Sequence, residues 1–303
     1  SIKLLKWYLS IDNQKDTARE YAEEQLMLTC FRKSLVDNPV DYNPMNIGDM
    51  VNTLDDEYVN QFYPAENKLI FTRRYAFGSR QDLLENIFAT KMYDSLWSIP
   101  QMLFEKIENV GAVSVSYDGK EMYFSGCGWT DGAGSCDIYL MQFNDGKWSA
   151  PINVSPINTS DWESQPCVSY DGKSLYFVRR NRKTATSDIY VSYREDNGDW
   201  SNPYKLSSNI NTNGNEMAPF IHYDDMTLYF SSDTHDGMGG YDLFMSRRNE
   251  RGEWGRPLNL GYPLNTEDDE INLVVAADAK SAYISSKRDD GYGAYDIYSF
   301  DLD

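Results

Sequence analysis

The segment "NPMNIGDMVNTLDDE", residues 43–57, is written a second time 213 residues later as "RPLNLGYPLNTEDDE", residues 256–270. The matching positions are Pro44 with Pro257, Asn46 with Asn259, Gly48 with Gly261, and Asn52-Thr53 with Asn265-Thr266. One copy lies near the start of the chain and the other lies near its end. Any fold proposed for this chain must explain that placement.

The rest of the chain is repetitive as well. Tryptophans recur at intervals of 51, 52 and 54 residues, at Trp97, Trp148, Trp200 and Trp254, and we expect them to be structural. Each copy reads as four short strands, with a turn such as "YDGK" (117–120 and 170–173) after the first, then "SLYFV" (174–178) and "DIYVSYR" (188–194). Asp-Gly between alternating apolar residues indicates a hairpin. Four antiparallel strands per unit of roughly 50 residues are typical of a β-propeller blade.

The repeated opening segment closes the ring in this interpretation. The last copy contains only three strands before the chain stops, so its outer strand is missing. We predict that residues 43–49 supply it by pairing with residues 295–302. The fold class is therefore all-β, a propeller of five four-stranded blades. Four blades are expected at about 52–103, 107–154, 157–206 and 210–260, and the fifth at 271–303. The second blade departs from the pattern, because "FEKIENVGAVSV" replaces the usual lead into its inner strand.

Residues 1–40 are predicted to form a helical segment, and residues 41–303 the propeller. The stretch 16–39 spaces its apolar residues at helical intervals, and Asn38-Pro39 would end the helix. Two alternatives remain open for this segment. It is either a cap on the propeller or the last helix of an upstream helical-repeat domain.

The composition excludes several classes of partner. The chain carries a formal charge of −19, so nucleic acid and anionic lipid surfaces would repel it. Its apolar runs fall short of the roughly 20 residues that span a bilayer, so no direct membrane span is expected. The four cysteines form no CxxC pair and there are only two histidines, which predicts no metal site and no cofactor.

Two cysteines bracket the glycine-rich loop "CGWTDGAGSC". If that loop is a hairpin, Cys127 and Cys136 face each other within disulfide reach. Otherwise they are small buried side chains.

Acidic residues recur once per blade. They are Glu57, Glu163, Glu216 and Glu270 before the inner strands, and Asp137, Asp188, Asp242 and Asp296 before the third strands. A catalytic pair is unique, whereas residues repeated in every blade are expected to hold turns through backbone N–H groups. No catalytic residue is predicted, since the "NDGKWS" turns miss the sialidase spacing and His222 and His235 have no nucleophile motif near them.

Basic residues gather in loops that should share one face. They are Arg73, Arg74 and Arg80, then Arg179, Arg180, Arg182 and Lys183, then Lys287 and Arg288, with Tyr75 and Phe77 beside the first group. One interpretation is that each pairs with an acid of its own blade. The other is an anion-binding face for a carboxylated glycan, a peptide or a partner protein.

The repeated motifs resemble a known family. "SYDGKxLYF", "DIYVSxR" and "GxWSxPxxL…INTxxDE" are similar to the PD40 (WD40-like) propeller repeat, which is related to the propeller of TolB. The opening helix followed by "NPV…NIG…VNTLDDEY…LIFTRR" resembles envelope proteins of bacteroidetes in which tetratricopeptide helices precede the propeller and an OmpA-like domain often follows. The type IX secretion component PorE has that architecture. The resemblance implies a periplasmic, outer-membrane-associated protein, and it agrees with a disulfide between Cys127 and Cys136.

The function predicted from these observations is a non-enzymatic scaffold of the cell envelope. Its expected partners are envelope proteins and peptidoglycan fragments, bound on the wide faces of a rigid disc. The alternative is a propeller glycosidase or lyase, or a small-ligand or metal-binding propeller, that uses the central channel. A catalytic use of the channel would require convergent, non-repeated acids.

Overall fold

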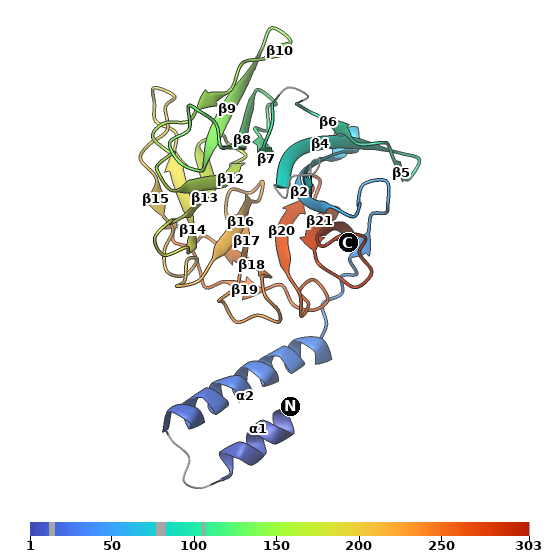
Figure 1. The fold of residues 1–303 in the computed structure, drawn as a ribbon, viewed down its shortest axis with the longest axis vertical. Coiled ribbons are helices and arrows are strands. Elements are labelled where there is room, and N and C mark those ends of the chain that lie inside the picture. Colours follow the sequence, from blue (N-terminus) through green and yellow to red (C-terminus); the bar gives the residue numbers. More distant parts are fainter. Residues whose placement is uncertain (12–15, 77–82, 105–106, 303) are drawn as a thin grey trace.

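The computed structural model describes residues 1–11, 16–76, 83–104 and 107–302. Two helices come first, α1 (Ile2–Leu9) and α2 (Asp16–Asp37), and they form a hairpin to one side of the strands (Figure 1). The helix α2 ends just before Asn38-Pro39, as the sequence predicts. Arg32 Nε donates to the carbonyl of Gly237 at 3.0 Å, which joins the hairpin to the propeller.

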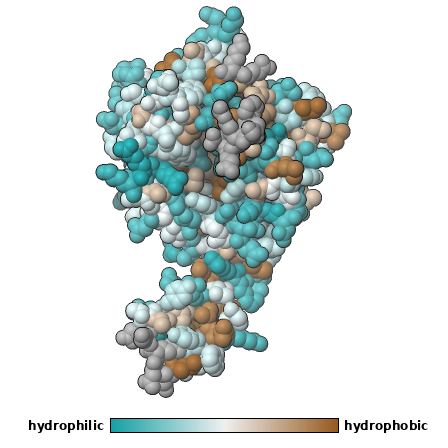
Figure 2. Space-filling model, viewed as in Figure 1, coloured by the Kyte–Doolittle hydropathy of each residue, from teal (hydrophilic) through white to brown (hydrophobic). Residues whose placement is uncertain are grey.

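The helical hairpin exposes large apolar side chains. Leu4, Trp7 and Met27 are 60%, 61% and 74% exposed, and Figure 2 shows apolar residues on this part of the surface. No helix in the described ranges is long and apolar enough to cross a membrane.

The remaining residues form five antiparallel sheets arranged as a ring (Figure 1). Blade 1 contains β2 (Asp56–Tyr63), β3 (Lys68–Ala76), β4 (Leu83–Tyr93), β5 (Leu96–Trp97) and β6 (Gln101–Met102). Blade 2 contains β7 (Val110–Val115), β8 (Glu121–Cys127), β9 (Cys136–Asn144), β10 (Lys147–Trp148) and β11 (Ile152–Asn153). In both blades the outer edge is divided between two short strands that pair with the third long one.

The other three blades have four strands each. Blade 3 contains β12 (Trp162–Val168), β13 (Ser174–Arg180), β14 (Ser187–Tyr193) and β15 (Tyr204–Lys205). Blade 4 contains β16 (Glu216–Ile221), β17 (Thr227–Ser232), β18 (Asp242–Arg247) and β19 (Leu258–Asn259). Blade 5 contains β20 (Glu270–Val275), β21 (Ser281–Ser286), β22 (Asp296–Asp301) and β1 (Met45–Asn46).

The predicted closure of the ring is confirmed. The strand β1 pairs antiparallel with β22, with Met45 opposite Ser299 and Asn46 opposite Tyr298. The side chain of Asn52 then forms hydrogen bonds with both backbone polar groups of one residue, Ile297, in the third strand of blade 5. It donates to the carbonyl of Ile297 at 2.9 Å and accepts from the Ile297 N–H at 2.8 Å. The segment near the start of the chain is therefore part of the last blade.

The second copy of the segment makes the same contacts one blade earlier. Asn265 donates to the carbonyl of Leu243 at 2.9 Å and accepts from its N–H at 2.7 Å. Asn158 and Asn211 bind β9 and β14 in the same way. The repetition of the segment thus has a physical reason, because each copy attaches the entry of one blade to the third strand of the blade before it.

Closure also joins the hydrophobic cores of the first and last blades. Phe62 and Phe71 of blade 1 pack in one buried cluster with Val274, Tyr283 and Ile297 of blade 5. The rings of Phe62 and Tyr283 lie 4.7 Å apart. An open array would leave these side chains in water, so burial of apolar surface drives the ring shut.

We predict that removing residues 1–50 destabilises the whole propeller. The truncation takes away β1 and exposes the edge of β22, so the midpoint of thermal unfolding should fall by at least about 10 °C. The measurement is thermal unfolding followed by circular dichroism. A truncation of residues 1–38 is the control, because it keeps β1 and should change the midpoint far less. Equal midpoints for the two truncations would show that ring closure does not depend on β1.

Candidate functional site

The repeated glutamates hold the entry loops of their blades. Each accepts both the backbone N–H and the hydroxyl of the threonine four residues earlier, at 2.6–3.0 Å. The pairs are Glu57 with Thr53, Glu163 with Thr159, Glu216 with Thr212 and Glu270 with Thr266. All four glutamates are fully buried. In blade 2 the same position is Val110, which accounts for the departure of that blade from the sequence pattern.

Burial raises the pKa of three of these glutamates, namely Glu57, Glu216 and Glu270. The pKa of Glu270 rises to about 7. The hydrogen bonds from Thr266 and Ser286 oppose this rise, and so does Arg288, whose Nη2 lies 4.0 Å from the carboxylate. The Glu270 carboxyl thus binds a proton more tightly in the folded chain than in the unfolded one.

The repeated aspartates bind the loops between the second and third strands. Asp137, Asp242 and Asp296 each accept two successive backbone N–H groups of that loop. Asp188 instead pairs with Lys205 at 2.8 Å. Asn86 replaces the aspartate in blade 1 and donates to the hydroxyl of Tyr75 at 2.7 Å.

The basic residues predicted to share one face fall into two groups in the structure, those bound within the protein and those exposed at the rim. Arg73 and Arg179 bind the glutamates of their own blades at 2.7 and 2.6 Å, and they also donate to entry-loop carbonyls. Arg288 donates to Ser286 and to the carbonyls of Pro263 and Leu264. Arg180, Arg182, Lys183 and Lys287 are exposed at the rim. Arg80 and Phe77 lie outside the described residues.

A cavity of about 400 Å³ runs along the propeller axis. The five inner strands β2, β7, β12, β16 and β20 supply most of its wall. Its polar groups include Asn60, Gln61 and Gln165. Ten aromatic residues also line it, and they are Tyr58, Phe62, Tyr63, Tyr117, Trp162, Tyr170, Phe220, Tyr223, Tyr241 and Tyr295. An apolar, concave site with few polar groups is typical of a small-molecule binding site.

Two carboxyl groups, those of Asp56 and Glu85, flank Arg74 on neighbouring strands beside this cavity. Arg74 on β3 is the register partner of both Asp56 on β2 and Glu85 on β4. Arg74 donates to Asp56 Oδ2 from Nε at 2.9 Å and from Nη2 at 2.6 Å. The other oxygen of Asp56 accepts the N–H of Tyr295 at 3.3 Å. Asp56 is therefore fixed as an ion pair, and Arg74 and Glu85 line the cavity.

Glu85 lies in a different environment from Asp56. Within the described residues its carboxyl group has neither an ion pair nor a hydrogen bond. Burial raises its pKa, the nearby Asp56 charge adds to the rise, and Arg74 opposes it. Its carboxyl lies over Gly111 of the next blade, where a Cβ would come within 2.6 Å of Oε2. Glycine at this position makes room for the Glu85 side chain.

This pair of carboxyl groups does not recur around the ring. The residues at the position of Glu85 in the other blades are Cys136, Ser187, Tyr241 and Tyr295. Glu85 is missed when only the acids that recur in every blade are considered. Comparing the residue just before the repeated third-strand acid, copy by copy, would have found it.

Aromatic side chains surround the carboxyl pair. The rings of Tyr58 and Tyr295 lie 5.4 Å apart, and the Arg74 guanidinium stacks 5.5 Å above the ring of Tyr58. The hydroxyl of Tyr295 donates to Asp269 Oδ2 at 3.0 Å. These contacts fix flat aromatic faces beside the charged groups.

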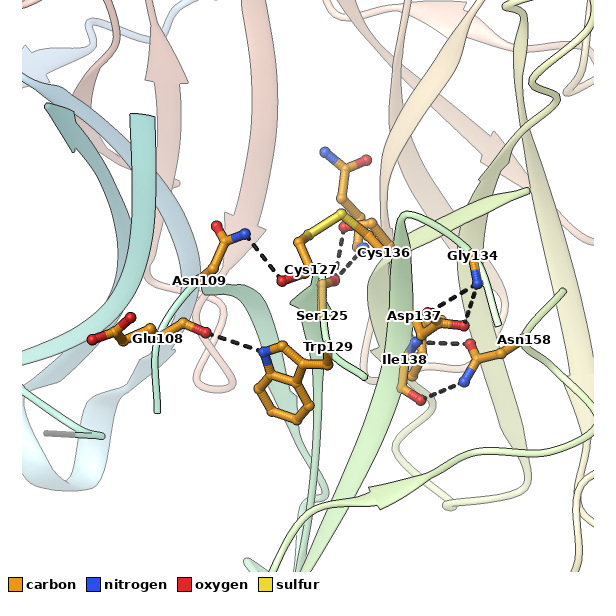
Figure 3. The surroundings of a disulfide bond; sticks show 12 residues. Glu108, Asn109, Ser125, Cys127, Trp129, Gly134, Cys136, Asp137, Ile138 and Asn158 are labelled. Atoms are coloured by element: carbon orange, nitrogen blue, oxygen red, sulfur yellow. Dashed lines mark hydrogen bonds between the residues drawn. A yellow bond between two sulfur atoms is a disulfide. The ribbon is translucent and has the colours of Figure 1, made fainter. Parts of the chain in front are cut away.

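In blade 2 a disulfide lies at the position that Glu85 has in blade 1. Cys127 at the end of β8 is bonded to Cys136 at the start of β9, with their Cα atoms 4.0 Å apart (Figure 3). Trp129 in the enclosed loop donates from Nε1 to the carbonyl of Glu108 at 3.1 Å. Cys30 and Cys167 are free thiols. In the portion of the chain that the structure describes, no cluster of His, Cys, Asp and Glu could hold a metal ion.

Comparison with known proteins shows the fold. No family model and no curated protein matches the chain. A structure of a BT0996 RGII complex aligns at a TM-score of 0.59 with 11% identity, covering 90% of this chain and 95% of that one. An endo-arabinase from Bacteroides thetaiotaomicron VPI-5482 aligns at 0.52 with 15% identity, covering 86% and 96%. A thermostable family-43 glycoside hydrolase aligns at 0.53 with 14% identity, covering 82% and 89%.

These likenesses confirm the β-propeller and correct the predicted function. Two of the three are named as an endo-arabinase and a glycoside hydrolase, and these neighbours contradict the prediction of a non-catalytic scaffold and the expectation that the chain is not an enzyme. The sequence analysis weighed only the carboxylates that recur in the repeat, and Glu85 is not one of them. The envelope location, the peptidoglycan link and the relation to the PD40 family stay predictions.

We predict that Glu270 makes stability depend on pH. Its pKa is raised from 4.5 to about 7, so the folded chain binds more protons than the unfolded chain between those values. Its contribution to stability is therefore present below pH 4.5 and is lost as the pH rises to 7, by up to about 3 kcal/mol. In Glu270→Gln the difference in unfolding free energy between pH 5 and pH 8 should shrink, as measured by urea denaturation.

The matched change is Ser286→Ala, which removes a hydroxyl that donates to the Glu270 carboxylate at 2.8 Å. Loss of that donor should move the pH dependence to higher pH. A carboxyl titration of Glu270 by NMR with a midpoint near 4.5 would contradict the prediction.

Proposed function

We propose that the chain is a glycoside hydrolase that binds a carbohydrate in the central cavity, with Glu85 as the general acid and Asp56 as its ionised partner. The observation that carries the proposal is the unlike environment of these two carboxyl groups: Glu85 lines the aromatic-containing cavity, and Asp56 is bound to Arg74, which also lines it. Paired carboxyl groups in contrasting environments are the usual acid and base of glycoside hydrolysis.

Each carboxyl group suits one half of the reaction. Glu85 is partly buried and has no hydrogen-bond donor among the described residues, so it keeps its proton to a higher pH and can pass it to the leaving glycosidic oxygen. Asp56 is held as a carboxylate by two N–H groups of Arg74. It faces the positive charge that develops at the anomeric carbon, and it either takes the proton of an attacking water or bonds to that carbon itself.

The wall of the cavity suits a sugar. Tyr58, Trp162, Tyr241 and Tyr295 offer aromatic faces to the C–H side of a sugar ring, while the amide nitrogens of Asn60 and Gln165 can donate to its hydroxyls. Proteins of the same fold include an endo-arabinase and a family-43 glycoside hydrolase. Arabinose-containing polysaccharides are therefore the first substrates to test.

We predict that the chain releases reducing sugar from a panel of plant and bacterial polysaccharides, and that this activity depends on both carboxyl groups. Glu85→Gln and Asp56→Asn should each lower kcat by about 10²- to 10⁴-fold, the range attributed to acid–base groups. The measurement is reducing-sugar release together with calorimetric binding. Glu85→Gln should still bind the sugar, because it keeps the shape of the site. Activity should also fall as pH rises through the raised pKa of Glu85, because the acid must be protonated.

The control is Asp233→Asn, which removes an exposed carboxylate of the rim that does not line the cavity. This variant should keep full activity. Binding of sugars without release of product, or release that persists in Glu85→Gln, would refute the proposed function.

A further inference from the structure

Two arginines occupy equivalent positions between neighbouring blades, at the ends of the strands opposite the carboxyl pair. Arg194 follows β14 and pairs with Trp200, and Arg248 follows β18 and pairs with Trp254. Each guanidinium stacks on its tryptophan, at 4.5 Å for Arg194 and 5.1 Å for Arg248. Each tryptophan also meets a tyrosine of the preceding blade edge-on, Tyr123 at 5.8 Å and Tyr176 at 6.3 Å.

The first of these interfaces, between blades 2 and 3, contains its own anion. The carboxylate of Glu121 accepts from Arg194 Nη1 at 3.2 Å and from Nη2 at 2.5 Å. The hydroxyl of Tyr123 donates to Glu121 at 2.9 Å and accepts from Arg194 Nη2 at 2.7 Å. One carboxylate therefore serves both Nη groups and the hydroxyl, while Arg194 Nε donates to the carbonyl of Gly172 at 3.0 Å.

The second interface, between blades 3 and 4, contains the equivalent arginine, tryptophan and tyrosine, but it lacks the carboxylate. Ser174 is the first residue of β13, as Glu121 is the first residue of β8, and each lies two residues before its tyrosine. Tyr176 is 1% exposed, and neither its hydroxyl nor Arg248 Nε has a hydrogen-bond partner among the described residues. Burial raises the pKa of Tyr176, so its oxygen stays a protonated donor.

The nearest acid is engaged elsewhere. The carboxylate of Asp225 accepts the backbone N–H groups of Tyr170 and Asp171 at 2.9 and 3.2 Å. Arg248 Nη2 donates to the backbone carbonyl of Asp225 and forms no ion pair within the described residues. Arg248 is partly buried, and a partly buried guanidinium without an ion-pair partner is disfavoured.

We infer that a small monovalent anion such as chloride binds between blades 3 and 4, on the guanidinium of Arg248 and the hydroxyl of Tyr176, where blade 2 uses the carboxylate of Glu121. The two unpaired atoms are both donors, which matches an anion. Both atoms are buried, and one guanidinium matches one negative charge. This site is separate from the axial cavity and does not depend on the proposed hydrolase activity.

The experiment measures thermal unfolding of the whole chain while chloride replaces gluconate at constant ionic strength. Because an anion that binds only the folded chain stabilises it by mass action, the midpoint should rise by about 3 °C for each tenfold increase in chloride above its dissociation constant. Ser174→Glu supplies the carboxylate internally, so it should raise the midpoint in gluconate and abolish the response to chloride. Glu121→Ser recreates the unpaired arrangement in the neighbouring interface and should strengthen the response.

A wild-type midpoint that does not respond to chloride would overturn the inference. So would a Ser174→Glu variant that keeps the wild-type response. If either variant fails to fold, bromide soaked into crystals of the wild-type chain decides the question. An anomalous peak between Arg248 and Tyr176 supports the site, and its absence there refutes it.

Discussion

Four asparagine side chains, three of them buried, hold the propeller together, because each binds both polar backbone groups of one residue in the blade before it. Asn52 does this to Ile297, and it is the contact that joins the start of the chain to its end. A buried peptide group without a partner is costly, so each asparagine fixes the angle and distance between two blades. The closed ring then defines the axial cavity, and the cavity sets the environment of every residue in the proposed site.

The polar residues of the blades form two levels with different roles. At the first level the repeated glutamates bind threonine, and in blades 1 and 3 also arginine, within their own blade. The second level lies one residue along each strand from the first. There the side chains differ from blade to blade, and blade 1 places Asp56, Arg74 and Glu85 together. The repeated level builds the scaffold, whereas the varied level carries different side chains in each blade and can therefore supply chemistry at one place in the ring.

Much of the fold could be predicted from particular residues. The Asp-Gly turns, the aromatic second strands and the duplicated "NT" motif predicted five blades and the closing strand, because hairpins and strand alternation are local properties. The proposed site could not be predicted in the same way. Glu85 has no motif around it, and its raised pKa comes from burial against Gly111 in a different blade.

The number of blades, the role of the duplicated segment and the pairing of the ends can all be read from the amino-acid sequence, since each follows from a repeat that can be counted. Which charged groups pair with one another is settled by the folded ring. It assigns Arg73 and Arg179 to glutamates of their own blades and Arg74 to Asp56, and it leaves Arg248 without an ion pair among the described residues. The reason is physical. A side chain's charge partner depends on distance in space, and around a ring that distance is set by neighbouring blades rather than by neighbouring residues.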